Sequence, residues 1–278
     1  MSDPAAKDRV QAVILDWAGT IVDHGSRAPM DAFVRAFWQL GVAITVADAR
    51  APMGLPKRDH IRALLNTPAV AASWRAKYGS APDERAIDAV FDIFEPMNAA
   101  SVREHAALIP GALLAVETLR ARGIRIGSTT GYTRPIMVEL APIAAGEGYV
   151  PEVIVCAGDL PAGRPTPLMT WYAMATMGVW PARTVVKVDD TPPGIEEGVA
   201  AGTWTVGVSL TGNIAGLSAD ELGALTQSER ATLRRRTEAE LLDAGADLVI
   251  DSVADLPGAI EVIESKLRAG DRPRRSGM

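Results

Sequence analysis

VQAVILDWAGT, residues 10–20, contains the strongest indication of how this chain folds. The apolar run 13–15 is typical of a strand that is buried on both faces of a parallel sheet. The run stops at Asp16, and the small residues 18–20 let the backbone turn tightly. Ligands bind beyond the carboxyl ends of strands in open α/β sheets, so we expect Asp16 to lie in a binding site. A carboxylate there can attack phosphorus and form an aspartyl phosphate.

The composition predicts a globular protein that acts on a small molecule. Of the 278 residues, 48% are hydrophobic and 22% are charged, and the formal net charge is −6. This acidic balance argues against a nucleic-acid partner. The sequence has no apolar run long enough to span a membrane and no signal peptide, so we expect a cytoplasmic protein without a membrane partner. Cys156 is the only cysteine, which excludes a disulfide framework, and its apolar neighbours predict a buried, inert thiol.

A mostly helical stretch interrupts the alternation of strands and helices after the first strand. Apolar residues at helical spacing predict helices over 29–40, 57–65, 69–78 and 82–101, with a short helix that Thr45 caps. We therefore expect a helical domain over residues 24–103. It would be inserted into an α/β domain formed by residues 1–23 and 104–278.

The rest of the chain predicts a doubly wound, Rossmann-like parallel sheet. Short apolar runs indicate strands over 124–127, 153–156, 184–188, 203–208 and 247–250, and helices are expected between them. Residues 218–244 are charged and helical in pattern. We expect residues 1–9 to form a loose leader and the Arg-rich residues 268–278 a frayed tail.

Polar groups follow four of the expected strands. Asp16 ends the first strand, the run 128–130 the second, and Asp189-Asp190 the fourth, while Arg164 lies in the loop after the third. Neighbouring parallel strands bring such ends together, and Arg164 can offer bidentate hydrogen bonds to a phosphoryl group. Each group alone has an ordinary structural interpretation as a helix cap, a turn residue or a surface cation. Their occurrence together favours phosphoryl transfer.

The same strand ends predict a magnesium site. Asp16 and Asp190 can hold Mg²⁺ through hard oxygen ligands, with the backbone carbonyl of Ala18 as a third ligand. The ion would stabilise charge during in-line transfer. Thr130 and the amide of Gly131 can donate hydrogen bonds to phosphoryl oxygens.

Together these motifs resemble the haloacid dehalogenase superfamily and, within it, the phosphonoacetaldehyde hydrolase (phosphonatase) family. They are DWAGT (16–20), STTGYT (128–133), the Arg164 loop, KVDDTPPGI (187–195) and, in the helical stretch, MGLPKRDH (53–60). The resemblance runs from about Val10 to Leu256. It implies a core with a helical cap domain, a magnesium-dependent homodimer, and hydrolysis of the C–P bond of phosphonoacetaldehyde.

The resemblance also implies the roles of individual residues. Asp16 falls at the nucleophile, and Asp16, the carbonyl of Ala18 and Asp190 fall at the metal ligands. Lys57 falls at the Schiff-base position. The remaining positions are supporting or substrate-binding ones, occupied by Met53, His60, Thr130, Gly131, Tyr132 and Arg164.

Lys57 suits this chemistry because a C–P bond breaks poorly when the leaving carbon must become a carbanion. A lysine amine that condenses with the aldehyde gives an iminium, which accepts the electrons as an enamine. The amine must be neutral, and we expect the start of a helix, the cation of Arg58 and desolvation to lower its pKa. His60 lies three residues on, so it shares the helix face and can move protons. A solvated lysine and a surface histidine are the ordinary alternative.

Three positions separate this sequence from related patterns. Phosphatases of the superfamily that cleave esters generally carry an acid two residues after the nucleophile, where this chain has Ala18. Ser26 stands where family members often have a cysteine, so no thiol role carries over. Gly194 stands where some members have an Asp, and Asp189 either supplies that carboxylate or only shapes the loop.

Two other functions remain open from the sequence. One is a magnesium-dependent phosphate-ester phosphatase or phosphomutase, in which Lys57 only binds anions. The other is a non-catalytic phosphate-binding protein, which gives no reason for both Asp16 and Lys57. For the homodimer, the apolar helix around Phe33 and Phe37 is the expected interface.

Overall fold

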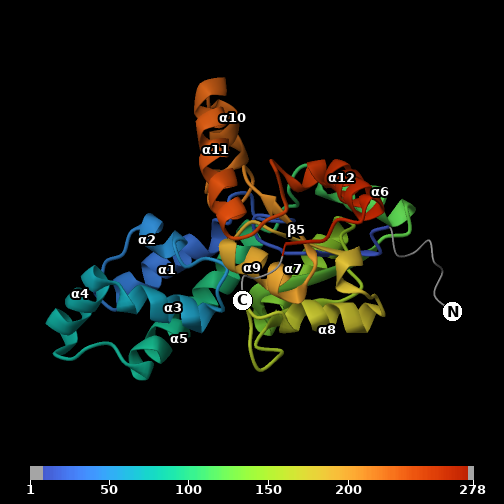
Figure 1. Cartoon of the computed structure of the whole chain (residues 1–278). Helices are drawn as coiled ribbons and strands as arrows, with labels where there is room; N and C mark the ends of the chain where they lie inside the picture. The colour runs from blue at the N-terminus through green and yellow to red at the C-terminus, as the bar shows by residue number, and fades with distance from the viewer. Residues whose placement is uncertain (1–8, 275–278) are drawn as a thin grey trace.

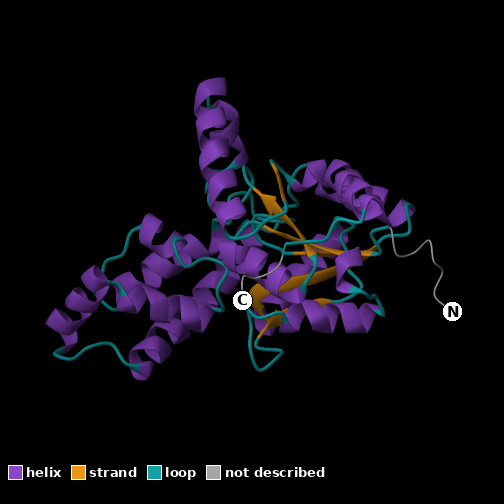
Figure 2. Ribbon diagram, viewed as in Figure 1, coloured by secondary structure: helices purple, strands orange, loops and turns teal. Residues whose placement is uncertain are grey.

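A six-stranded parallel sheet forms the centre of the larger part of the molecule (Figure 2). The structure is a computed structural model that describes residues 9–274. The strand order is β3-β2-β1-β4-β5-β6, which is that of a doubly wound fold whose order reverses between β1 and β4. The strands are β1 (Ala12–Leu15), β2 (Arg125–Thr133), β3 (Ile154–Ala157), β4 (Val185–Asp189), β5 (Trp204–Val208) and β6 (Leu248–Ile250). The predicted fold class is confirmed.

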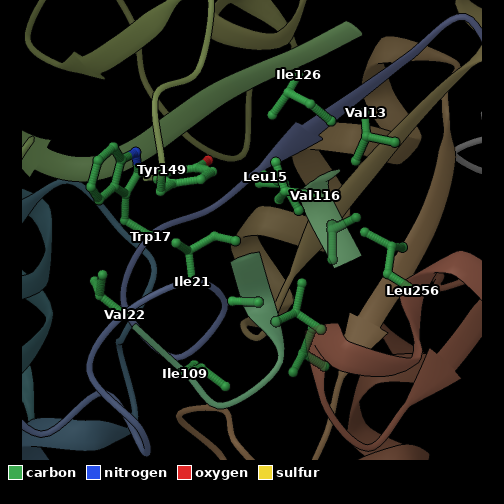
Figure 3. Close-up of a cluster of buried hydrophobic side chains, with 14 of the residues drawn as sticks. Val13, Leu15, Trp17, Ile21, Val22, Ile109, Val116, Ile126, Tyr149 and Leu256 are labelled. Carbon is green, nitrogen blue, oxygen red and sulfur yellow. The ribbon is translucent and has the colours of Figure 1, made fainter. Parts of the chain in front are cut away.

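Helices cover both faces of this sheet, which explains the uninterrupted apolar sequence of β1. Val13 and Leu15 pack in one cluster with α6 and α12, whereas Ala12 and Ile14 pack in another with α8. Figure 3 shows part of the first cluster. The helices of this part are α6 (Ala112–Ala121), α7 (Arg134–Gly146), α8 (Leu168–Met177), α9 (Pro192–Ala201), α10 (Ala219–Ala224), α11 (Gln227–Asp243) and α12 (Leu256–Ala269).

Five helices between β1 and α6 form a second part, which we call the helical insert (28–104; Figure 1). They are α1 (Ala28–Gln39), α2 (Val46–Arg50), α3 (Lys57–Asn66), α4 (Pro68–Tyr78) and α5 (Glu84–Glu104). The insert has a hydrophobic cluster of its own, separate from those on the sheet. Thr45 caps α2 as predicted, in a capping box with Asp48.

The side chains of Phe33 and Phe37 are fully buried inside that cluster. These two side chains are therefore not available to an interface between two chains, and the interface expected on this helix stays a prediction. Amphipathic spacing identified the correct helix, but the apolar face is covered by the insert itself.

The polar run after residue 127 does not leave the sheet, contrary to the sequence-based expectation. β2 continues to Thr133, and Ser128 pairs with Ile154 of β3. The hydroxyl of Ser128 donates a 2.8 Å hydrogen bond to the carbonyl of Leu15, so its burial costs little. Because its hydroxyl groups find hydrogen-bond partners, β2 can remain a strand while it brings these polar residues to the site.

The last third of the chain and the two termini differ in part from the expectations. The charged stretch forms two helices rather than one, and Ser218 and Thr226 each start a helix with a capping box. Helix α12 was not predicted from the sequence. Of the expected leader and tail, residues 1–8 and 275–278 lie outside the described residues, and 268–269 end α12. Across residues 9–274, none of the helices has the length and apolar character needed to traverse a bilayer.

Substitution of Leu64 by Ala tests the independent core of the insert. Leu64 is fully buried in the cluster of the insert, so Leu64→Ala should lower the free energy of unfolding by about 2–5 kcal/mol. Urea denaturation followed by circular dichroism measures this. Leu114→Ala is the matched control, because Leu114 is 70% exposed and its loss should cost no more than about 0.5 kcal/mol. Equal losses in both variants would contradict this packing.

Candidate active site

The predicted site residues meet in one small cavity between the sheet and the helical insert. Its lining consists of Asp16, Ala18, Ser26, Pro29, Met53, Gly54, Lys57, Thr130, Gly131, Tyr132, Arg164, Asp190 and Thr191. Every predicted site residue except His60 is among them. The cavity measures about 20 Å³, room for little more than one water molecule. The helical insert and the part of the molecule around the sheet, which we call the sheet domain, therefore lie close together at the site.

Asp16 enters this cavity from the carboxyl end of β1, at the switch point of the sheet. β1 pairs with β2 on one side and with β4 on the other, which places the end of β4 next to Asp16. The following residue, Trp17, is fully buried and packs edge-on against Tyr149, with ring centres 5.3 Å apart (Figure 3). Trp17 thus fixes the turn from which the carboxylate projects.

Asp16, Asp189 and Asp190 form a buried group of carboxylates. Oxygen atoms of the three lie within 4.8 Å of one another. Burial and the charge of Asp189 raise the pKa of Asp16 to about 6. Burial, Asp16 and Asp189 raise the pKa of Asp190 well above its ordinary value. Repulsion between close carboxylates disfavours their charged forms, and a cation between them would remove that cost.

This group of carboxylates suits a metal ion, because one of its buried oxygen atoms has no hydrogen-bond partner. Oδ2 of Asp190 accepts a 2.6 Å hydrogen bond from the amide of Asn213, but Oδ1 is buried without a partner. An unpaired buried carboxylate oxygen is costly unless a ligand completes it. Hard oxygen donors suit a divalent cation, and Ala18 lines the same cavity.

Asp189 shapes the loop after β4. Its Oδ1 accepts hydrogen bonds from the amide and hydroxyl of Thr191, and its Oδ2 lies 2.6 Å from Nζ of Lys187. A Cβ built on Gly194 would lie only 2.1 Å from both carboxylate oxygens of Asp189. The glycine therefore makes room for this carboxylate, and a side chain at 194 would displace it.

Arg164 lies across the carboxylate group and stays charged. Its Nη2 donates to Asp16 Oδ1 at 2.6 Å and lies 3.0 Å from Asp189 Oδ2. Burial works to lower the pKa of Arg164, but Asp189 and Asp16 outweigh it, so the pKa lies above the ordinary arginine value. The predicted surface alternative for Arg164 is wrong, since its side chain is buried.

Lys57 reaches the cavity from the helical insert, as the first residue of α3. Its side chain is buried, with Nζ 3.6 Å from Sδ of Met53. The rings of Tyr132 and Phe33 have their centres 5.6 and 5.7 Å from Nζ. Burial lowers the pKa of Lys57 to about 8, although the carboxylate of Asp16 opposes this. The surroundings therefore increase the fraction of the amine that is neutral near pH 7.

The nearby cation that contributes to this pKa is Arg164, not Arg58 as the sequence suggested. Arg58 turns away from the cavity, where it forms a 2.5 Å ion pair with Asp88 and lies over the ring of Phe91. Adjacent helical residues point in different directions, so sequence proximity to Lys57 was misleading.

The loop before Lys57 docks directly on the sheet domain. Gly54 has a φ of +94°, and a Cβ on it would lie 2.3 Å from the hydroxyl oxygen of Thr191. Only glycine allows both this backbone conformation and this close approach. Pro56 then precedes the first residue of α3. The MGLPK sequence thus places the amine beside the carboxylate group.

His60 lies behind the cavity rather than in its wall. Its ring stacks on Phe33 at 4.0 Å, and Nε2 lies 2.8 Å from the carbonyl oxygen of Ala49. Because a carbonyl only accepts, Nε2 carries the proton and Nδ1 is left buried without a partner. Burial and Lys57 lower the pKa of His60 well below its ordinary value, so the imidazole is neutral.

Tyr132 and Thr130 bring hydroxyl groups to the opposite wall. The hydroxyl of Tyr132 is buried without a partner, and burial, Asp23 and Asp16 raise its pKa well above the ordinary value. It therefore remains a donor. Thr130 Oγ1 accepts a 3.1 Å hydrogen bond from the amide of Tyr132, which leaves its own proton available.

Several buried polar residues near the site were missed from the sequence. Asp23 accepts hydrogen bonds from the amides of Arg27 and Ala28 and so fixes the start of α1. Lys187 and Glu197 lie beneath Arg164. Lys187, within the apolar run of β4, could have indicated a buried acidic partner. No sequence pattern indicated that Glu197 would be buried. Cys156 is buried as predicted, and burial raises the pKa of its thiol to about 12.

Comparisons with known proteins agree on one group. A model of the haloacid dehalogenase-like hydrolase family matches residues 10–202. Phosphonoacetaldehyde hydrolases of Paraburkholderia phytofirmans and Paraburkholderia xenovorans are 51% and 52% identical to this chain, each over 95% of it and 99% of the relative. The crystal structure of a phosphonoacetaldehyde hydrolase-like protein from Oleispira antarctica, 42% identical, matches with a TM-score of 0.93. The match covers 95% of this chain and 96% of the Oleispira antarctica chain.

Replacement of Lys57 by Met tests the depressed pKa through stability. Lys57 has a folded pKa of about 8 and an ordinary value near 10.5, so the unfolded chain binds more protons between these pH values. The contribution of Lys57 to stability therefore rises with pH across that window. Relative to wild type, Lys57→Met should lose about 3 kcal/mol of unfolding free energy between pH 7 and pH 10.5.

Denaturant unfolding from pH 7 to 10.5 measures the difference. Lys77→Met is the matched control, since Lys77 is exposed, and its free energy of unfolding at pH 7 should stay within about 0.5 kcal/mol of wild type. A pH-independent difference for Lys57→Met would show that the amine has an ordinary pKa.

Proposed function

Because this chain belongs to the phosphonoacetaldehyde hydrolases, within the haloacid dehalogenase-like hydrolases, we propose that it hydrolyses the C–P bond of phosphonoacetaldehyde. The products are acetaldehyde and phosphate. The observation that carries the proposal is the meeting of Asp16 and Lys57 in one small cavity, although they come from different parts of the molecule.

The Lys57 amine opens the reaction by condensing with the aldehyde. Condensation releases water and gives a protonated imine on Nζ. Asp16 then attacks phosphorus, the C–P bond breaks, and its electron pair moves into the imine to form an enamine. Protonation of the enamine carbon and hydrolysis of the imine release acetaldehyde and restore Lys57. A second water hydrolyses the aspartyl phosphate.

The phosphoryl group is held by donors on the sheet side. Thr130 has an available hydroxyl proton, the amide of Gly131 lies next to it, and Arg164 is a fixed cation beside Asp16. We assign Asp16, Asp190 and the carbonyl of Ala18 as ligands of Mg²⁺. When bound, the ion neutralises the anionic oxygens and stabilises charge during transfer.

Three residues around the amine support the condensation. Met53 and the rings nearby exclude water, which keeps the amine desolvated. His60 has an unpaired Nδ1 that can accept a hydrogen bond, and Tyr132 has an unpaired hydroxyl that can donate one. His60 also supports Phe33 beneath the amine.

Residues 24–103 are proposed to act as a cap domain that opens and closes. The cavity holds little more than one water, so the substrate enters only when the loop around Gly54 separates from the sheet domain. Closure then excludes water from the imine. On the family resemblance, we further propose a homodimer in the cytoplasm.

Ala18 favours this reaction over ester hydrolysis. A phosphatase or phosphomutase needs an acid for its alkoxide leaving group, and alanine has no proton to give. An enamine leaves without that acid. Purified protein with Mg²⁺ should release phosphate and acetaldehyde from phosphonoacetaldehyde, and little phosphate from simple esters. The reverse preference would refute the proposed function.

Borohydride reduction in the presence of phosphonoacetaldehyde should label Lys57. The reduced imine remains as an ethyl or a phosphonoethyl group on Nζ, and peptide mass spectrometry locates it. The peptide with exposed Lys77 is the internal control and should stay unlabelled. Lys57→Arg should lose turnover and labelling but keep its circular dichroism spectrum, because a guanidinium does not condense with the aldehyde. Labelling spread equally over both lysines would contradict a dedicated Schiff base.

Substitution of Asp190 by Asn tests the metal site. The loss of one anionic ligand should raise the Mg²⁺ concentration for half-maximal activity roughly tenfold or more. A magnesium titration of activity after treatment with a chelator measures it. Asp220→Asn removes the same charge at an exposed position and should leave the titration unchanged. An unchanged magnesium requirement in Asp190→Asn would exclude Asp190 as a ligand.

A further inference from the structure

Glu197 of α9 is a fully buried carboxylate that the chemistry above does not use. Its Oε2 accepts a 3.0 Å hydrogen bond from Nε of Arg164, and its Oε1 accepts one of 2.7 Å from the hydroxyl of Thr170. Oε2 also lies 3.4 Å from Oγ1 of Thr129 and 3.8 Å from Nζ of Lys187. Every neighbour is thus a donor, which only a carboxylate can satisfy.

Helix α9 approaches the sheet closely enough to place this carboxylate beneath Arg164. A Cβ on Gly198, the next residue, would lie 2.6 Å from Cγ2 of Thr205 and 2.8 Å from Cβ of Lys187. The absence of that Cβ lets α9 lie directly against β4 and β5. The position of Glu197 is therefore built into the packing of the fold.

The side chain of Arg164 borders open space, so its orientation towards Asp16 depends on a bond that holds it. Besides the small cavity, it lines a much larger hollow of about 550 Å³ between α3 and the loop 157–166. The guanidinium is planar, so a bond that fixes Nε also fixes the directions of both Nη groups. In the structure Nη2 donates to Asp16 at 2.6 Å.

We propose that Glu197 is a positioning residue, which holds Arg164 at Nε so that its Nη edge faces Asp16 and the phosphoryl group. This inference rests on the proposed function, in which Arg164 binds that group. Thr170 contributes to this positioning, since its hydroxyl donates to Oε1 of Glu197 and so orients the carboxylate.

Glu197→Gln tests the proposal, because glutamine keeps the shape but turns one acceptor into a donor. The dissociation constant of inorganic phosphate, measured by calorimetry with Mg²⁺, should rise roughly 10- to 100-fold. KM for phosphonoacetaldehyde should rise with it, while borohydride labelling of Lys57 at saturating substrate persists. Glu196→Gln is the matched control on the same helix, with an exposed side chain, and should match wild type.

A double-mutant cycle separates positioning from a purely structural role. If Glu197 acts through Arg164, Glu197→Gln adds little to the loss of phosphate binding already caused by Arg164→Ala. Additive losses, or unchanged phosphate binding in Glu197→Gln, would overturn the proposal. Should that variant not fold, Thr170→Val should weaken phosphate binding and Thr170→Ser should restore it; equal binding in both overturns the proposal. Phosphate binding needs no C–P cleavage, so failure of the proposed reaction in wild type is a separate result.

Discussion

The burial of a single amine, that of Lys57, is the constraint on which the rest of the site depends. Its Nζ lies among a thioether and two aromatic rings, with Asp16 as the compensating anion. Water would stabilise the charged amine by far more than these groups do. With a pKa of about 8, roughly one amine in ten is neutral at pH 7, compared with about one in several thousand for an exposed lysine. The closed contact of the insert with the sheet domain is what creates this environment.

The carboxylates on the other side of the cavity pose the opposite problem, because too many anions are buried together. Even with Lys57 counted as charged, three buried cations (Arg164, Lys187 and Lys57) face four buried carboxylates (Asp16, Asp189, Asp190 and Glu197). A divalent cation would balance this excess, and it would lower the raised pKa values that hinder ionisation of Asp16. The binding of a metal ion, the position of Arg164 and the ionisation of Asp16 are therefore coupled through the net charge of the site.

Sequence patterns predicted those parts of the molecule that local chemistry determines. The apolar run before Asp16 predicted a doubly buried strand, and the ends of four strands predicted the convergence of Asp16, Arg164 and Asp190. Patterns failed where long-range packing decides. The run after residue 127 resembled a loop because its hydroxyl groups find partners only in the folded sheet. Arg58 turned away from the amine, and Glu197 shows its role only once α9 lies beside Arg164.

The protonation state of Lys57 can be observed directly by nuclear magnetic resonance. Protein labelled with ¹³C at the lysine Cε is titrated from pH 6 to pH 11, and the Lys57 signal is assigned by its loss in Lys57→Arg. A midpoint near pH 8 is expected, well below the ordinary lysine value of about 10.5. A midpoint at 10 or above would show that the amine is an ordinary solvated cation, and would contradict its role as the electron sink.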